Sequence, residues 1–286
     1  MRKILSLLIV GAVILSGIGV LAAPSQTSRH PTATATTDDD VPVWTVGDSW
    51  TYTVNNIIVN YSSGGQQIHM TGQIDDFTWT VTDASGLYYT VALTGKLTAT
   101  YDILFTQGST YHFVGSITPQ LTRLKGTLQL TKTDLQIHHV NLQLVGITMT
   151  KFNSLPFNIP VPIKLISDGG LNTDFPLFDF PLYTLKFWNL PDVTLTMSST
   201  FGGIFGLIQI PFTVTVHYSF MPFAFWMLDQ ESITVPAGTY NADKIVSLIG
   251  DTFAYYYAPS AGNIVKIDLV LPLGELHAAL KSTTYS

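Results

Sequence analysis

Cysteine is absent from the 286 residues of this chain. Without thiols the protein can form no disulfide, thiolate metal site, cysteine nucleophile or lipidated cysteine anchor. Charge is also scarce, because Asp, Glu, Lys and Arg together make up only 11% of the residues and Glu231 and Glu275 are the only glutamates. Few Glu and Lys combined with many Thr, Val, Tyr and Phe favour strands over helices.

The short motifs of common enzyme sites are missing too. The sequence has no HExxH, no GxSxG, no phosphate-binding glycine loop and no dinucleotide fingerprint. The formal net charge of −6 argues against nucleic acid as a partner, since phosphates need a basic surface. It also argues against simple electrostatic docking to anionic lipid. We therefore expect a protein that is not an enzyme and that uses no cofactor or metal.

What is present begins with an export signal over residues 1–22. Arg2-Lys3 is the basic start, residues 4–21 form the apolar core, and Val20-Leu21-Ala22 supplies the small residues before a cleavage site. The pattern predicts cleavage after Ala22 and an extracellular or cell-surface location. An uncleaved membrane anchor over residues 4–22 is the alternative, because the apolar run is almost long enough to span a bilayer.

Residues 23–41 predict a flexible linker rich in Thr, Ser, Pro and Asp, with too few large apolar residues to fold. The remaining residues, 42–286, are long for an average domain but normal for one β-barrel or β-sandwich. Within them Asn60 opens an N-x-S sequon, which matters only in a host that glycosylates.

Strand signals run through most of this domain. Apolar alternation predicts strands over residues 44–59, 73–82, 88–99, 111–117 and 121–131, and again near Leu142 and over 208–220. Residues 231–271 predict a β-meander, in which turns at 236–238, 250–251 and 258–262 separate four runs. Gly238 is expected to need a positive φ in the first of these turns. The prediction is an all-β domain, mainly an antiparallel meander sheet.

Residues 152–192 interrupt the pattern with six prolines among Phe, Leu, Ile and Val. Because proline removes ladder donors, we expect this insertion to stay out of the central sheet. Either it packs as a lid, or it exposes an apolar surface for a ligand, membrane or partner. Within 155–182 the candidate ligand-binding side chains are Phe157, Phe175, Phe178 and Phe180.

Polar residues offer weaker candidates. Asp168, Gly170, Asn172, Asp174 and Asp179 have the spacing of a calcium loop, but Thr173 occupies the glycine position, so an ordinary turn is preferred. His138-His139 resembles a metal pair, although neighbours on a strand face opposite ways. Asp75-Asp76 predicts a turn rather than an acid–base pair.

Two quoted motifs carry a resemblance. "VGDSWTYTV" at 46–54, and "ESITVPAGTYNADKI" followed by "YYAPSAGNIVKI" within 231–267, resemble the opening and closing segments of the TapB-like group of exported proteins of unknown function. The resemblance implies a fold and an exported location but no catalytic residues. More distantly, LolA-like lipoprotein carriers offer the analogy of a sheet curved into a half-barrel around an apolar cavity.

Two functions follow as hypotheses. The first is a non-catalytic cell-envelope protein that binds a lipid or other apolar ligand in a curved sheet. The second is a structural or adhesive surface module that acts through protein–protein contacts, including sheet edges.

Overall fold

The computed structural model describes residues 41–63, 66–107, 109–153, 156–189, 193–202, 209–218, 224–247, 253–271 and 274–286. They form one antiparallel sheet of fifteen strands, with a single 3-10 turn, η2, at Pro259–Ala261. The predicted all-β antiparallel fold is therefore confirmed. The predicted signal, residues 1–22, and all but the last residue of the predicted linker, residues 23–41, lie outside the described residues. The strands are β1 (Ser49–Ser63), β2 (Gln66–Asp83), β3 (Tyr88–Gln107), β4 (Ser109–Ile117), β5 (Thr122–Thr131), β6 (Ile137–Phe152), β7 (Ile159–Phe175), β8 (Phe187–Asn189), β9 (Val193–Gly202), β10 (Gln209–Tyr218), β11 (Ala224–Val235), β12 (Gly238–Ser247), β13 (Phe253–Ala258), β14 (Asn263–Leu271) and β15 (Gly274–Thr283).

The sheet is two meanders joined side by side. Its order is β10-β9-β7-β6-β4-β3-β2-β1-β15-β14-β13-β12-β11-β8. β5 lies off this path and, like β4, pairs with both β3 and β6, but at other residues of those strands. The first meander runs from β1 to β7 and the second from β11 to β15. The last strand, β15, joins them by pairing with both β14 and β1. Because the two ends of the domain meet in the middle of the sheet, neither meander is a separate domain.

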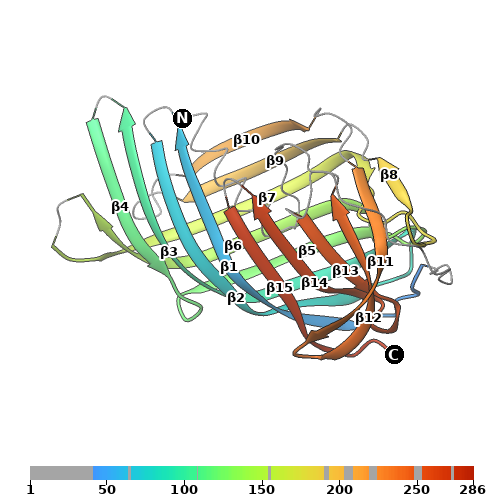
Figure 1. The fold of residues 1–286 in the computed structure, drawn as a ribbon. Helices are drawn as coiled ribbons and strands as arrows, with labels where there is room; N and C mark the ends of the chain where they lie inside the picture. The colour runs from blue at the N-terminus through green and yellow to red at the C-terminus, as the bar shows by residue number, and fades with distance from the viewer. Residues whose placement is uncertain are drawn as a thin grey trace.

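The sheet curves strongly (Figure 1). The strands β1–β4 and β11–β15 lie on the near side of that view, and β6, β7, β9 and β10 lie on the far side. Sharp bends in long strands come from bulges. One bulge separates Asp75 from Thr78 in β2, where Asp76 has a φ of 50°.

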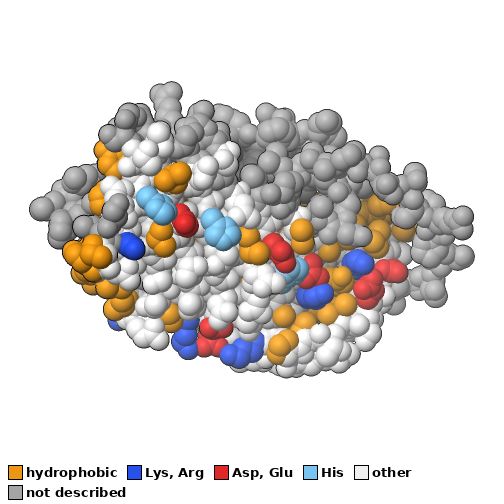
Figure 2. Space-filling view, turned by 60° about the vertical axis from the view of Figure 1, so that its left-hand side comes forward, with side chains coloured by type: hydrophobic (Ala, Val, Ile, Leu, Met, Phe, Trp, Pro, Cys, Tyr) orange, Lys and Arg blue, Asp and Glu red, His pale blue; other side chains and the backbone are white. Residues whose placement is uncertain are grey.

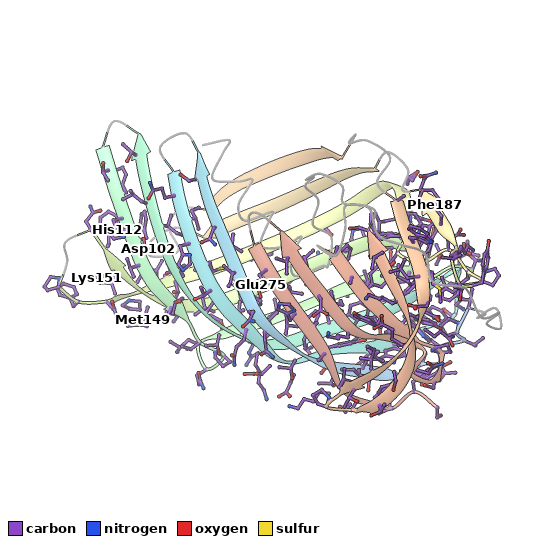
Figure 3. The ribbon with its side chains drawn as sticks, in the orientation of Figure 1. Asp102, His112, Met149, Lys151, Phe187 and Glu275 are labelled. Carbon is purple, nitrogen blue, oxygen red and sulfur yellow. The ribbon has the colours of Figure 1, made fainter. Side chains whose placement is uncertain are left out.

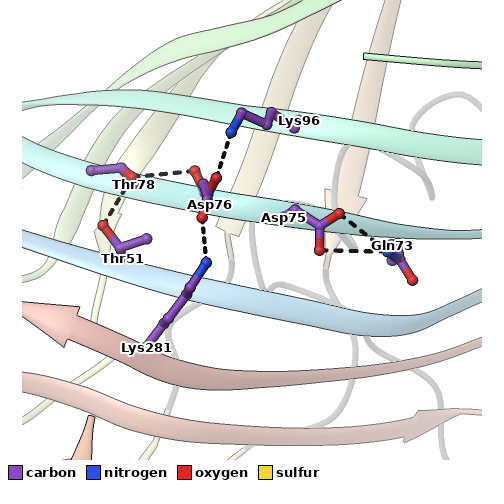
Figure 4. Close-up of polar contacts among 7 residues, drawn as sticks. All are labelled: Thr51, Gln73, Asp75, Asp76, Thr78, Lys96 and Lys281. Atoms are coloured by element: carbon purple, nitrogen blue, oxygen red, sulfur yellow. Dashed lines mark hydrogen bonds and ion pairs between the residues drawn. The ribbon is translucent and has the colours of Figure 1, made fainter. Parts of the chain in front are cut away.

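Asp75 and Asp76 therefore do not form a turn; the pair is part of a bulge inside β2, which corrects the sequence prediction. Asp76 bonds Lys96 and Lys281, each at 2.6 Å, while Asp75 accepts from Gln73 (Figure 4). The Lys281 and Lys96 hydrogen bonds lower the pKa of Asp76 to about 2. The bulge thus directs one carboxylate to two lysines on β3 and β15.

The proline-rich insertion also departs from the prediction. Residues 159–175 form β7, which pairs with β6 along its length, so prolines do not keep this part out of the sheet. The physical reason is the register. Pro160 and Pro162 face Met149 and Ile147 of β6, whereas β9 pairs only with residues 167–171 of β7. Proline is tolerated on an edge, where the missing N–H faces away from the neighbour.

The strands of the predicted C-terminal meander are confirmed as β11–β14, with the first turn at Pro236-Ala237 between β11 and β12. The second predicted turn, at 250–251, lies outside the described residues. Gly238 follows that turn with a φ of 142°, so the expected positive φ is present. Aromatic side chains of β1 bond the third turn and the start of β14. Trp50 Nε1 donates to the Ala261 carbonyl at 2.6 Å, and the Tyr52 hydroxyl donates to the Ile264 carbonyl at 2.9 Å.

Candidate apolar binding surface

The two faces of the curved sheet differ in chemistry. Along strands such as β3 and β5, alternation sends apolar side chains to the inner face and polar ones to the outer face. On β3 the buried inner side chains are Val91, Leu93, Leu97 and Ala99. The exposed outer side chains between them are Thr94, Lys96, Thr98 and Thr100. The inner face is the apolar surface on which a ligand site has to be sought.

One end of the inner face, here called the β8 end, is filled by aromatic packing. Phe178 lies with its ring centroid 5.8 Å from that of Tyr255 and 5.2 Å from that of Tyr257. Phe225 and Phe253 extend the same cluster through Tyr255. Edge-to-face contacts of this kind add stability beyond the area buried. Phe178, Tyr255, Tyr257 and Phe225 are all at most 2% exposed, so this end is solid core.

The segment after β7, residues 176–186, covers the β8 end and is tied down by polar bonds. The Tyr255 hydroxyl donates to the Leu177 carbonyl, and Trp188 Nε1 donates to the Pro176 carbonyl at 3.2 Å. Burial raises the pKa of Tyr255 well above its usual value, so this hydroxyl stays a donor. Lys186 is itself largely buried and bonds the Pro181 carbonyl at 2.9 Å. The segment is therefore an integral part of the packing at this end.

The four phenylalanines predicted to bind a ligand do not form one site. Phe175 and Phe178 are buried in the core, and Phe180 packs on Phe178 and on Tyr257 at 5.3 and 5.5 Å between ring centroids. Phe157 precedes β7, is 57% exposed and lies at the opposite end of that strand. A strand of this length separates Phe157 from Phe175 by roughly 50 Å.

The opposite end of the inner face, here called the β4 end, is less completely packed. Ile103, Phe113 and Phe152 lie in one cross-strand row on β3, β4 and β6, and all three are only half-buried. The Phe113 and Phe152 ring centroids are 5.0 Å apart. Figure 3 shows this end at the left, near the labelled His112 and Lys151, and the β8 end at the right, near Phe187.

A polar group lies next to this row without breaking its apolar character. The Tyr101 side chain crosses Gly115 of β4, where a Cβ atom would collide with its ring. Its hydroxyl meets Thr148 Oγ1 at 2.9 Å and Thr150 Oγ1 at 2.6 Å. Thr148 in turn donates to the Ser116 carbonyl at 2.7 Å. The polar atoms of this group are therefore bonded to each other, and the Tyr101 ring adds to the apolar surface.

These β4-end residues were not identified from the sequence, although a signal was available. The residues Gln107-Gly108-Ser109 are typical of a tight turn, and a turn there fixes the register of the hairpin on either side of it. Counting outward pairs Phe105 with Tyr111, Ile103 with Phe113 and Tyr101 with Gly115, as observed. Phe152 had no such signal, because its pairing with Phe113 joins residues far apart in sequence.

Many of the ionisable residues lie on the outer face, but the candidate metal sites are not assembled there. The residues of the proposed calcium loop up to Asp174 lie on the extended strand β7, and Asp179 pairs instead with Lys186 at 3.3 Å. His138 bonds Asp174 at 2.7 Å and His139 bonds Asp168 at 3.1 Å, so the two histidines have separate partners. Among the described residues, no three His, Asp or Glu side chains are grouped to hold a metal ion.

Histidines beside acidic side chains cross this outer face (Figure 2). His277 of β15 lies between two carboxylates, with Nδ1 at 2.8 Å from Asp268 and Nε2 at 2.7 Å from Glu275. Both bonds can be donated only by the doubly protonated ring. Burial by itself lowers the pKa of His277, but these hydrogen bonds outweigh it and raise the pKa above the usual value.

Comparison with known proteins gives no family. No family model, no curated protein and no solved structure matches this chain. In the part of the chain that the structure describes, no helix has the length and hydropathy needed to cross a bilayer. Any function must therefore be argued from the faces of the sheet themselves.

Proposed function

We propose that the protein is a non-catalytic, exported cell-envelope protein that holds a lipid or other apolar ligand against the inner face of its curved sheet at the β4 end. The observation that carries the proposal is the contrast between the two ends. The β8 end is filled by Phe178, Tyr255 and Phe225, whereas the inner row at the β4 end is only half-buried. Half-exposed apolar side chains on a concave face are what an apolar ligand covers.

The positions of the charged residues support the same proposal of an apolar ligand. Asp76 of β2 pairs with Lys96 of β3 and Lys281 of β15 on the outer face. The row of Ile103, Phe113 and Phe152 carries no charge that would fix a polar substrate. Export is supported by the basic start and apolar core of residues 1–22.

Two substitutions on one strand test the proposal. Phe113 and Val114 are neighbours on β4, so Phe113→Lys places a charge on the inner face and Val114→Lys places the same charge on the outer face. The readout is equilibrium binding of a fluorescent fatty acid, with far-UV circular dichroism to confirm folding. We expect Phe113→Lys to weaken binding at least tenfold, since desolvating a charge against an apolar ligand costs more than about 1.4 kcal/mol.

Val114→Lys should leave binding unchanged. If Phe113→Lys fails to fold, Phe152→Ser removes part of the same surface without adding charge and should also weaken binding. Equal binding by all three variants would contradict the proposal. A wild-type protein that takes up no probe but forms concentration-dependent oligomers would favour the structural or adhesive module instead.

A further inference from the structure

A second surface, on the outer face of β4–β7, combines exposed apolar side chains with basic ones. The apolar members are Val114, Val145, Ile147, Met149, Pro160 and Pro162. The basic members are Arg123, Lys125, Lys151 and Lys164. We call these ten residues the basic outer patch.

Strand register places the patch on one face. Val145 of β6 lies between Arg123 of β5 and Lys164 of β7 in a single cross-strand row. The following rows on the same face pair Ile147 with Pro162 and Met149 with Pro160. With strands about 4.8 Å apart, Arg123 and Lys164 lie roughly 10 Å apart across Val145.

Four of the six apolar side chains of the patch, including Pro160, are exposed, and Met149 and Pro162 are half-buried. Val114 is 37%, Val145 38% and Ile147 40% exposed. Hydrophobic side chains gather around a basic side chain at the left-hand edge of Figure 2, and Figure 3 labels Lys151 and Met149 at this end of the sheet. Neighbouring exposed apolar residues on the face of a sheet indicate an interaction surface more strongly than scattered ones do.

The cations of the patch differ from the other lysines. Among the described residues, no carboxylate forms an ion pair with Arg123, Lys125, Lys151 or Lys164, and all four side chains are exposed. The lysines elsewhere are engaged: Lys96, Lys186, Lys244, Lys266 and Lys281 in ion pairs and Lys132 with the Ala84 carbonyl. Although the chain has a net charge of −6, the cations of the described residues that lack a carboxylate partner therefore lie on this one face, with the exception of Lys132.

Two acidic residues border the patch, Asp102 and Asp168, so its four basic side chains leave it with a net positive charge. Asp102 is in register with Val114 but bonds His112 at 2.8 Å, and Asp168 is in register with Asn141 and bonds His139. Acidic residues on other faces are screened, because the Debye length is about 8 Å at physiological ionic strength. The net charge, which argues against electrostatic docking of the whole chain, does not describe this patch.

We propose that the basic outer patch docks the protein on a lipid bilayer that carries anionic headgroups. Lysine and arginine side chains reach the headgroup phosphates, while the aliphatic side chains between them enter the interface. A purely polar polyanion would leave the aliphatic side chains uncovered, and a neutral apolar partner would leave the cations unpaired. Docking by the outer face does not depend on a ligand bound to the inner face.

The experiment compares two double variants with the same net charge. Lys151→Gln/Lys164→Gln removes two charges from the patch, whereas Gln67→Glu/Thr98→Glu makes the same change at exposed outer positions on β2 and β3. Both full-length proteins are sedimented with vesicles of phosphatidylcholine alone or with phosphatidylglycerol added. At about 1 kcal/mol for each cation, the patch variant should bind the anionic vesicles roughly 30-fold more weakly than the wild type.

The control variant should bind like the wild type, and added salt should weaken binding of both. Ile147→Ser should weaken binding to anionic vesicles while leaving its salt dependence unchanged. Binding through residues 1–22 would be the same for all variants and would not require anionic lipid. Equal loss in the two double variants, or no preference of the wild type for anionic vesicles, would overturn the proposal. So would a self-association that the patch variant abolishes without any vesicle binding.

Discussion

Phe178 and Phe157 belong to one proline-rich stretch of sequence but have opposite environments. Phe178 is 2% exposed among Tyr255, Tyr257 and Phe180, whereas Phe157 is 57% exposed. Local sequence does not separate them, because each is a phenylalanine within two residues of a proline. What separates them is the position of β7 between them, which brings Phe178 back over the core.

Truncating these two residues should therefore give different results. Phe178→Ala removes a fully packed ring and should lower the free energy of unfolding by about 3–5 kcal/mol, through lost transfer energy and a cavity. Phe157→Ala, the matched control, should change it by less than about 0.5 kcal/mol. Urea denaturation measures both. A small effect at Phe178 would mean that residues 176–186 are not part of the core.

His277 makes the stability depend on pH. Because the folded-state pKa is raised above 6.5, its contribution is fully present below the unfolded-state pKa and is lost as pH rises through the folded-state value. The stability difference between wild type and His277→Gln should therefore be larger at about pH 5.5 than at about pH 8.5. Thermal unfolding across this range measures it, and His69→Gln, whose ring bonds only Asn60, is the control. A difference that grows with pH would contradict the charged assignment of His277.

At the scale of elements, the sequence predicts strands well where apolar residues alternate and turn residues bound them. This holds for β5 and for the strands of the meander β11–β14, whereas the strand predicted over 88–99 covers only the first part of β3. It fails for β7, where Pro160 and Pro162 argue against a strand although they occupy a one-sided edge. The two prolines lie on an edge because β9 pairs only with residues 167–171 of β7. No local sequence pattern predicts where that pairing stops. Residues 274–283 form β15 with Leu276, Ala278 and Leu280 inward, but their small alanines give only a weak strand signal.

The two segments that carry the TapB-like resemblance make direct contact. Trp50 and Tyr52, from the first segment, donate to the Ala261 and Ile264 carbonyls of the second. Trp44, just before the first segment, donates to the Gly262 carbonyl at 2.8 Å. The junction between the two meanders therefore explains the aromatic residues of the first segment. They donate hydrogen bonds to backbone carbonyls at and just after the turn around η2.

Pro160 and Pro162 should protect the edge of β7 from other chains. Residues 159–166 pair with β6 and, in the described part of the chain, with no strand on their other side. An unprotected edge next to exposed Val145 and Ile147 would recruit further strands. Pro160→Val/Pro162→Val should therefore aggregate at lower protein concentration than wild type, as followed by light scattering. Pro156→Val, an exposed change outside the strand, should not, and equal solubility of all three proteins would contradict this role.

At the scale of the whole molecule, one curved sheet explains how a chain of this composition is stabilised. A chain without cysteine and with few charges has to be stabilised by apolar packing, and the inner face supplies it. The candidate site was predictable only as a class, an apolar surface in a curved sheet. The position of the site could not be predicted. The proline-rich stretch indicates the β8 end, whereas the half-buried row at the β4 end depends on long-range pairing of Phe113 with Phe152.

The most direct test of apolar ligand binding is mass spectrometry of an organic extract of the purified wild-type protein, calibrated against protein concentration. The proposed function predicts an apolar compound in near-stoichiometric amount, and a clear reduction of that compound in extracts of Phe113→Lys but not of Val114→Lys. An extract of folded wild-type protein that contains no such compound, or the same amount from both variants, would contradict binding at the β4 end.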